Sequence, residues 1–163
     1  MGRDADERRG ALTNLLPGTA ISIRAVAADW REAVRRAGEA LVRSGAVTAA
    51  YTDEMIATVE ELGPYIVIAP GIALAHSRPS PAVKRTGLSF VTLAAPVEFG
   101  NEANDPVRLV IGLAAPDETG HVEALAELAE LLVDDERREA LLAADDPGTV
   151  GSIVAAFERE HAA

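Results

Sequence analysis

The spacing of apolar residues changes twice along this chain, and that change limits the possible folds more than any other feature. Apolar residues recur at helical intervals from Asp29 to Pro64, gather in short β-rich runs from Tyr65 to Ala115, and return to helical intervals after Thr119. Helices are thus followed by strands and then by helices, without the strict alternation of a βαβ chain. We expect one α/β domain with a mixed β-sheet flanked by helices on both sides.

Turn and capping residues mark the ends of the predicted elements. Asp29 can cap a helix that Gly45 ends, and Gly63-Pro64 stops a second helix. Residues 20–26 predict a first strand, and the runs YIVIA, IALAH, LSFVTLAA and VRLVIGLAA predict four more. Three helices follow, HVEALAELAELLVDD, DERREALLAADD and PGTVGSIVAAFEREH. Helical spacing also predicts the inward faces. In the helix that Asp29 caps, this face comprises Trp30, Ala33, Val34, Ala37 and Leu41, and in the helix that Gly63-Pro64 stops it comprises Tyr51, Met55, Val59 and Leu62. In HVEALAELAELLVDD it comprises Val122, Leu125, Leu128, Leu131 and Leu132.

Composition narrows the class of protein. The 163 residues suit one domain, which we expect over residues 11–163 behind a flexible tail over residues 1–10. A net charge of −11 argues against nucleic acid and anionic membranes as partners. The chain has no cysteine, which excludes disulfides and cysteine nucleophiles within it. Its N-terminus lacks the apolar core of a signal peptide, and no run approaches the roughly 20 apolar residues of a membrane span, so we expect a cytoplasmic location.

His76 is the first candidate for chemistry, because it ends the run GIALAH and opens the loop SRPSPAVKRTG. The ordinary interpretation is a strand-end histidine hydrogen-bonded to backbone. The stretch from Leu62 to Val97 has no Asp or Glu, however, and its only charges are those of Arg78, Lys84 and Arg85. A locally basic loop suits an anion such as phosphate. If Ser77 continues the strand, His76 and Arg78 point to the same side and can act together.

The other two histidines are less informative. His121 begins a predicted helix, and helical periodicity alone favours an ordinary first-turn residue. The functional alternative is that Gly120 and His121 bring a second imidazole and free backbone N–H groups to the same pocket. His161 lies near the chain end and is expected to be solvated. No HxxxH or HxH spacing occurs, so we expect no metal site, and no GxSxG or nucleotide-binding glycine loop is present.

Three segments in combination resemble the enzyme IIA domains of the bacterial sugar phosphotransferase system, in the mannitol/fructose branch and closest to ascorbate-type members. They are GPYIVIAPGIALAHSRP, PVEFG and NDPVRLVIGLAAPDETGHVEALAELAELL, and the similarity runs from about Leu15 to Phe157. The resemblance implies that His76 accepts a phosphoryl group from phospho-HPr and that His121 is the supporting histidine of the pocket. Ser77 and Arg78 would bind the phosphate. It implies no cofactor, and it implies an enzyme IIB cysteine and a membrane enzyme IIC on other chains.

Two departures from the family pattern and two alternative functions accompany this resemblance. Ala75 replaces the family's proline before the active histidine, and the stretch MIATVEELG lacks the arginine of mannitol-type members, which favours the ascorbate type. A regulatory module of the same fold would also need His76. In a small-molecule binding protein, the third possibility, His76 would only hydrogen-bond a ligand. The sequence indicates neither the sugar nor the oligomeric state. We expect the loop 77–87 and the turn 97–100 to rim a partner surface poor in acids.

Overall fold

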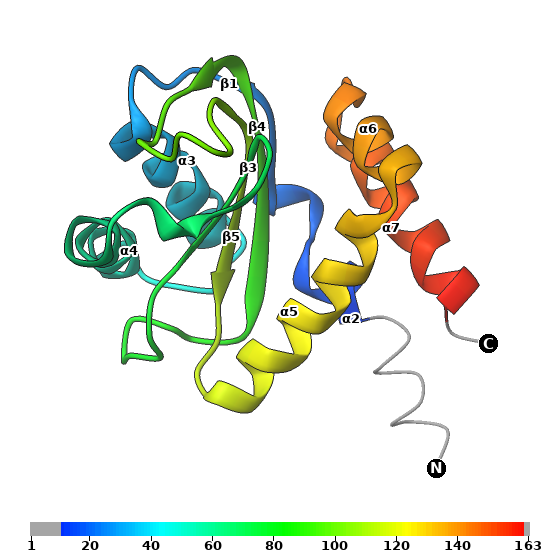
Figure 1. Ribbon diagram of the computed structural model, residues 1–163. Coiled ribbons are helices and arrows are strands. Elements are labelled where there is room, and N and C mark those ends of the chain that lie inside the picture. Colours follow the sequence, from blue (N-terminus) through cyan, green and yellow to red (C-terminus); the bar gives the residue numbers. More distant parts are fainter. Residues whose placement is uncertain (1–10, 162–163) are drawn as a thin grey trace.

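A five-stranded mixed sheet forms the centre of the computed structural model, which describes residues 11–161 (Figure 1). The strand order is β1-β4-β5-β3-β2, with β1/β4 and β3/β5 parallel and β4/β5 and β2/β3 antiparallel. The prediction of a mixed sheet is therefore confirmed, whereas the expected tail lies outside the described residues. The strands are β1 (Ile21–Ala25), β2 (Val67–Ala69), β3 (Ile72–His76), β4 (Gly87–Val97) and β5 (Val107–Ala114).

Helices cover both faces of this sheet, as the sequence predicted (Figure 1). Helices α3 and α4 build one core with the sheet, and α2, α5, α6 and α7 build a second core on the opposite face. Two short 3-10 helices, η1 (Gly18–Ala20) and η2 (Pro64–Ile66), precede β1 and β2. The α-helices are α2 (Ala11–Leu15), α3 (Trp30–Arg43), α4 (Ala50–Leu62), α5 (Glu118–Val133), α6 (Asp135–Ala143) and α7 (Pro147–His161).

The first core depends on a close approach of α3 to the middle of the sheet. Asp29 caps α3 by accepting a hydrogen bond from the Glu32 backbone N–H at 2.9 Å. Gly112 lies on β5 beneath the helix, where an added Cβ would come within 2.3 Å of Ser89 Oγ and 3.1 Å of Leu41 Cδ1. Only glycine fits there, and this contact fixes how β5 sits between the two helical layers.

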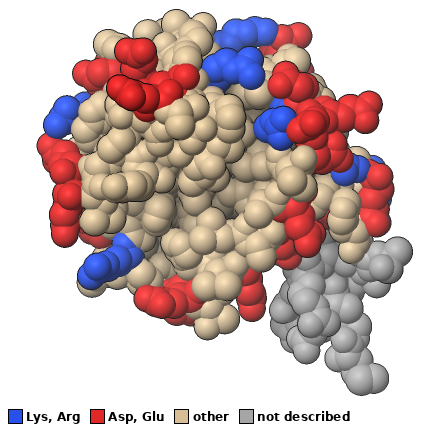
Figure 2. Space-filling view, viewed as in Figure 1, with Lys and Arg blue, Asp and Glu red and all other residues tan. Residues whose placement is uncertain are grey.

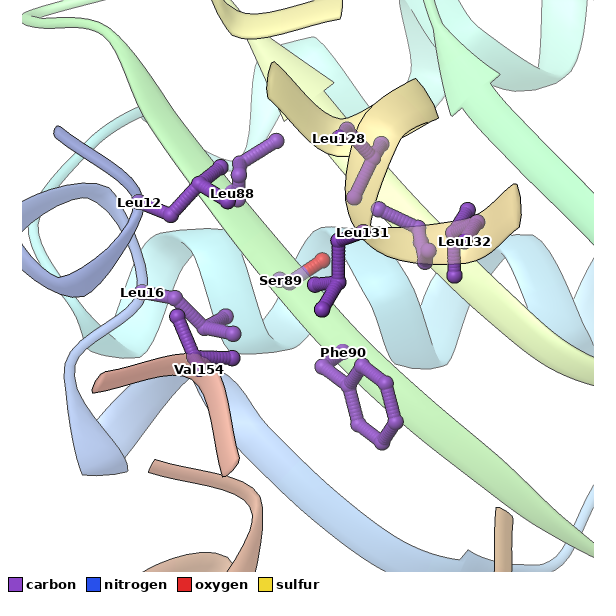
Figure 3. Close-up of a pocket in the computed structure, with 10 residues that line it drawn as sticks. Leu12, Leu16, Leu88, Ser89, Phe90, Leu128, Leu131, Leu132 and Val154 are labelled. Carbon is purple, nitrogen blue, oxygen red and sulfur yellow. The ribbon is translucent and has the colours of Figure 1, made fainter. Parts of the chain in front are cut away.

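The second core contains a small void between the sheet and the helices α5 and α7 (Figure 3). Its volume is about 10 Å³, and its lining is apolar except for Ser89. The Ser89 hydroxyl donates its one proton to the Ala37 carbonyl on the α3 side, away from this void. An apolar space of this size stays empty, and we regard it as a packing gap rather than a binding site. Ten residues line it: Leu12, Leu16, Leu88, Ser89, Phe90, Ile111, Leu128, Leu131, Leu132 and Val154.

Strand register decides which loops meet at the end of β3. His76 pairs with Leu113 near the end of β5, and Gly87 at the start of β4 pairs with Ala114. Val97 pairs instead with Val107, at the other end of the sheet. The expectation that the turn 97–100 rims the His76 pocket is therefore wrong, because an 11-residue strand separates that turn from the loop 77–87.

Several element boundaries differ from the predictions. Tyr65 and Ile66 belong to η2 rather than to a strand, and α5 begins at Glu118 rather than at His121. Leu62 and Val122, expected to face inward, are 59% and 63% exposed. Both lie near helix ends that line an open cleft, so their helical phase brings them beside the cleft and not into either core.

Charged side chains are unevenly distributed over the surface. Figure 2 shows uncharged side chains across the middle of the face seen in Figure 1, with acidic and basic side chains around the margin. The segment from Leu62 to Ser77, which contains β2 and β3, carries no Asp, Glu, Lys or Arg. The net charge of −11 is thus carried by the surrounding helices and loops. Within residues 11–161, no helix combines the length and apolarity needed to cross a membrane.

Candidate functional site

His76 lies at the carboxyl end of β3, where four buried residues give way to a half-buried imidazole. Its Nδ1 is 3.0 Å from the Leu74 carbonyl oxygen. A carbonyl can only accept, so Nδ1 carries the proton and donates it, which leaves a free lone pair on Nε2. The neutral ring is therefore held in the tautomer whose Nε2 can act as a nucleophile.

The second predicted histidine lies directly beside the first. The ring centroids of His76 and His121 are 5.5 Å apart, and the ring planes are inclined by 62° in an edge-to-face arrangement. Burial lowers the pKa of His121, the nearby His76 lowers it further, and Glu118 opposes both effects. His121 is thus expected to be neutral at pH 7. The structure brings together the two histidines that sequence analysis singled out.

The backbone N–H groups expected at the start of this helix are already used. Asp117 caps α5, with its Oδ1 accepting from the Gly120 N–H at 2.8 Å. The His121 N–H points to the Asp117 carbonyl at 3.4 Å. Because α5 starts three residues earlier than predicted, the Gly120 N–H is a capped first-turn donor and the His121 N–H belongs to the helical ladder. The alternative that Gly120 and His121 bring free backbone N–H groups to the pocket is therefore wrong.

Both histidines line an open cleft of about 590 Å³. One wall is formed by the second half of α4 and the other by the first turn of α5, with the end of β3 and the following loop between them. Ser77 and Arg78, predicted to bind phosphate, line this cleft as well. The full lining is Glu54, Ala57, Thr58, Glu61, Leu62, His76, Ser77, Arg78, Pro79, Ser80, Glu118, His121 and Val122.

The cleft is more acidic than the sequence suggested. Glu54 and Glu61 from α4 and Glu118 from α5 all contribute to its lining. A stretch of sequence without acids therefore does not produce a pocket without acids, because neighbouring helices supply them. The expectation of few acids around His76 is wrong, and Arg78 is the one arginine in the lining.

Only the first part of the loop 77–87 belongs to the cleft. Val83 forms an isolated antiparallel bridge with Val47, and Lys84 donates its backbone N–H to the Ala46 carbonyl. The Arg85 guanidinium donates to the Ser44 carbonyl. These contacts join the second half of the loop to the segment that follows α3. Lys84 and Arg85 are consequently outside the cleft lining, although the sequence placed them with Arg78.

Sequence reasoning missed two hydroxyl groups of α4 that contact the residue after His76. The buried Tyr51 hydroxyl contacts the Ser77 backbone, and Thr58 Oγ1 lies 3.0 Å from Ser77 Oγ. The Thr58 hydroxyl donates to the Glu54 carbonyl at 2.9 Å, so Ser77 is the donor to Thr58. Tyr51 and Thr58 are seven residues apart and therefore lie on one face of the helix. This spacing is the sequence feature that could have pointed to the two hydroxyl groups.

This arrangement suits group transfer from a large donor. A neutral imidazole with a free Nε2 is nucleophilic at neutral pH. The cleft is open enough for another protein to bring a reactive group to the ring, and Arg78 and the Ser77 hydroxyl can approach an anionic group there. No electron transfer or nucleotide is needed for such a step.

Comparison with known proteins gives consistent matches. The family model described as "Phosphoenolpyruvate-dependent sugar phosphotransferase system, EIIA 2" matches residues 14–156. The ascorbate-specific PTS system EIIA component of Escherichia coli (strain K12) is 40% identical over 131 residues, which cover 80% of this chain and 85% of that protein.

Two solved structures are also similar. One is the solution structure of the mannitol-specific cryptic phosphotransferase enzyme IIA CmtB from Escherichia coli (TM-score 0.79, 33% identity, 89% of this chain and 98% of that chain). The other is the complex of enzyme IIAMTL and phosphorylated enzyme IIBMTL from Escherichia coli (TM-score 0.75, 31% identity, 87% and 99%).

The fold is thus that of a phosphotransferase component. The chain belongs to the EIIA 2 family of the phosphoenolpyruvate-dependent sugar phosphotransferase system. It is a phosphocarrier for sugar uptake, and the family resemblance inferred from the three sequence segments is confirmed.

Proposed function

We propose that His76 Nε2 accepts the phosphoryl group of phospho-HPr and passes it to the cysteine of a separate enzyme IIB chain, in the cytoplasm. In the first step an N–P bond forms at His76 as the N–P bond of the donor phosphohistidine breaks. In the second step the IIB cysteine thiolate forms an S–P bond as the N–P bond to His76 breaks, and the His76 lone pair is restored. The observation that carries the proposal is the Nδ1 contact with the Leu74 carbonyl, because in the neutral ring it places the free lone pair on Nε2 in an open cleft.

The neighbouring side chains have distinct roles in this proposal. Arg78 and Ser77 bind the equatorial phosphoryl oxygens, whose charge is spread during transfer. His121, 5.5 Å from His76 between ring centroids, supports the phosphohistidine without carrying the phosphate itself. Residues 11–163 form the phosphotransfer domain. Metal ions and nucleotides take no part in the two steps as written.

The similar proteins support the proposed partners and cargo. Enzyme IIAMTL, 31% identical to this chain, is solved with phosphorylated enzyme IIBMTL, which supports an enzyme IIB partner here. The 40% identity to ascorbate-specific EIIA components supports uptake of an ascorbate-type carbohydrate. A membrane enzyme IIC would complete that route and would contact IIB rather than this chain.

The test is intact-mass measurement after incubation with enzyme I, HPr and phosphoenolpyruvate. Wild type should gain one phosphoryl group and His76→Ala none, whereas His121→Ala should still be labelled but should pass the label slowly to IIB. His161→Ala is the matched control, because that ring lies against Phe157 at the end of α7. Full labelling of His76→Ala would contradict the assignment. Label that never reaches an IIB cysteine would favour the regulatory module instead.

A further inference from the structure

Tyr51 is a fully buried tyrosine whose hydroxyl lies among the backbone groups beside His76. Its oxygen is 2.9 Å from the Ser77 nitrogen, 2.9 Å from the Leu113 carbonyl oxygen and 3.2 Å from the Ser77 carbonyl oxygen. Burial raises the pKa of this phenol to about 12, so it keeps its proton at neutral pH. The hydroxyl can therefore both accept and donate at this place.

The donors and acceptors at the strand ends show what the hydroxyl does. His76 and Leu113 form the last pair of the parallel β3/β5 ladder. Beyond it, the Ser77 N–H donates to the Tyr51 oxygen, and the Tyr51 proton goes to the Leu113 carbonyl or to the slightly more distant Ser77 carbonyl. One side chain from α4 thus bridges the two strand ends where the ladder stops. Without it, the Ser77 N–H would lose its partner in a partly buried position.

The side chain of Ser77 is held by the same helix. Its hydroxyl donates to Thr58 Oγ1, because the Thr58 proton is directed to the Glu54 carbonyl. Tyr51 therefore fixes the main chain of Ser77, and Thr58 fixes its side chain. Both hydroxyls project from one face of α4, which forms a wall of the cleft.

We propose that Tyr51, assisted by Thr58, is a positioning residue that holds the His76 imidazole in line with the incoming phosphoryl group. This inference rests on the proposed function of His76. The His76 ring is hydrogen-bonded to the Leu74 carbonyl of its own strand. The orientation of the ring therefore depends on the backbone conformation from Leu74 to Ser77. Tyr51 holds the end of that segment. Phosphoryl transfer is sensitive to such placement, because catalysis here consists mainly of positioning and charge stabilisation.

Tyr51→Phe is the direct test, since phenylalanine has almost the same volume and removes only the hydroxyl. We expect phosphorylation of His76 by phospho-HPr to slow about tenfold at saturating donor, with the KM for phospho-HPr unchanged. Tyr65→Phe is the matched control, because Tyr65 is the other tyrosine, is 83% exposed and lies outside the cleft lining. It should react at the wild-type rate.

A second readout does not depend on phosphotransfer. Nitrogen NMR of the imidazole reports which ring nitrogen is protonated, and wild type should show the proton of His76 on Nδ1. Tyr51→Phe should show a mixture of tautomers, because the strand end is then free to shift. Thr58→Val is a second variant and should give a smaller change of the same kind. Thermal unfolding of each variant would confirm that rates are measured on folded protein.

The outcomes separate the inference from the function on which it rests. A wild-type protein that takes no label from phospho-HPr would contradict the proposed function. A wild type that is labelled, with Tyr51→Phe and Thr58→Val folded and equal to it in rate and tautomer, would overturn the positioning role. A rise in KM at unchanged saturated rate would also overturn it, because that result would assign Tyr51 to partner binding.

Discussion

Among single residues, His121 is the titratable group of the cleft whose pKa the fold shifts. Its ring lies edge-to-face with His76 at 5.5 Å, and burial together with that neighbour lowers its pKa. The unfolded chain therefore binds more protons at this site below about pH 6.5 than the folded chain does. The stability contributed by the neutral ring is present above that pH and is lost as the pH falls through the folded pKa.

This leads to a titration experiment on the two histidines. In unphosphorylated protein the NMR titration midpoint of His121 should lie below 6.5, the value of a free imidazole. After phosphorylation of His76 the midpoint should rise, because a dianionic group then faces the ring and favours the imidazolium. An unchanged His121 midpoint after labelling would show that its ring does not face the phosphate.

The functional role of a residue could be inferred from the sequence only where the signal is local. His76, Ser77, Arg78 and His121 follow from a strand-end histidine, a basic loop and a family motif, and the structure places all four around one cleft. Tyr51 was assigned to the core, which is correct for its ring. Its hydroxyl bonds join residues 26 and 62 positions away, and no spacing rule predicts such contacts.

At the level of elements, α2 shows how tertiary contacts create a helix that its sequence did not predict. The buried carboxylate of Glu158 on α7 accepts from the backbone N–H groups of Leu12 and Thr13, each at 2.8 Å, and from the Thr13 hydroxyl. These bonds satisfy the first donors of a five-residue helix that is too short to be stable alone. Leu12 then packs into the second core.

Removing that carboxylate should therefore destabilise the whole domain. We expect Glu158→Ala to lower the free energy of unfolding by about 2 kcal/mol, because several charge-assisted bonds to buried or partly buried donors are lost together. Denaturant unfolding followed by circular dichroism would measure it. Glu130→Ala, at an exposed position of α5, is the control and should change stability by less than about 0.5 kcal/mol. Equal stability of the two variants would show that α2 adds little to the fold.

Element types were easier to predict than element ends. The change from period 3.6 to period 2 identified the helical and strand regions, since burial on one face imposes that spacing. The start of α5 was missed because Asp117 caps it from a turn rich in polar residues. Leu62 and Val122 were assigned inward by spacing, yet the cleft between α4 and α5 exposes them, and only the packing of the two helices shows that.

Considered as a whole, the molecule presents a mixed surface at the mouth of the cleft. Exposed Leu62 and Val122 lie there with Arg78 and three glutamates. A partner that must bring a phosphohistidine or a cysteine to His76 would contact this rim. Such a contact combines an apolar centre with polar margins, as transient interfaces do.

Charge reversal tests this docking surface. Arg78→Glu should reduce the rate of phosphorylation about tenfold at low salt, because it removes a cation from the cleft and adds a repelling charge. Arg159→Glu, exposed in the last turn of α7, makes the same change in net charge and should have little effect. Lys84→Glu should resemble Arg159→Glu, since Lys84 is outside the cleft lining. Equal slowing by all three would show that net charge alone governs the encounter.

The arginines of α6 do not suit that experiment as remote controls. Arg137 bonds to Asp134 and Glu160 and stacks over Phe157, and Arg138 bonds to Asp135 and the Leu132 carbonyl. Reversing either charge would disturb packing as well as electrostatics. The net charge follows from the composition, but the positions of the charged side chains around the cleft depend on which helices meet there.

The bonds from Glu158 to Leu12 and Thr13 also have a topological meaning. They bring the beginning of α2 and the last turns of α7 within hydrogen-bonding distance, so the described chain enters and leaves the fold at neighbouring points. Chain ends that meet in this way can be joined, because a short linker need not stretch across the domain. Circular permutation is therefore open to this domain. New ends fit the loop 26–28 between β1 and α3, where Val26 and Ala28 are exposed and no residue lines the cleft.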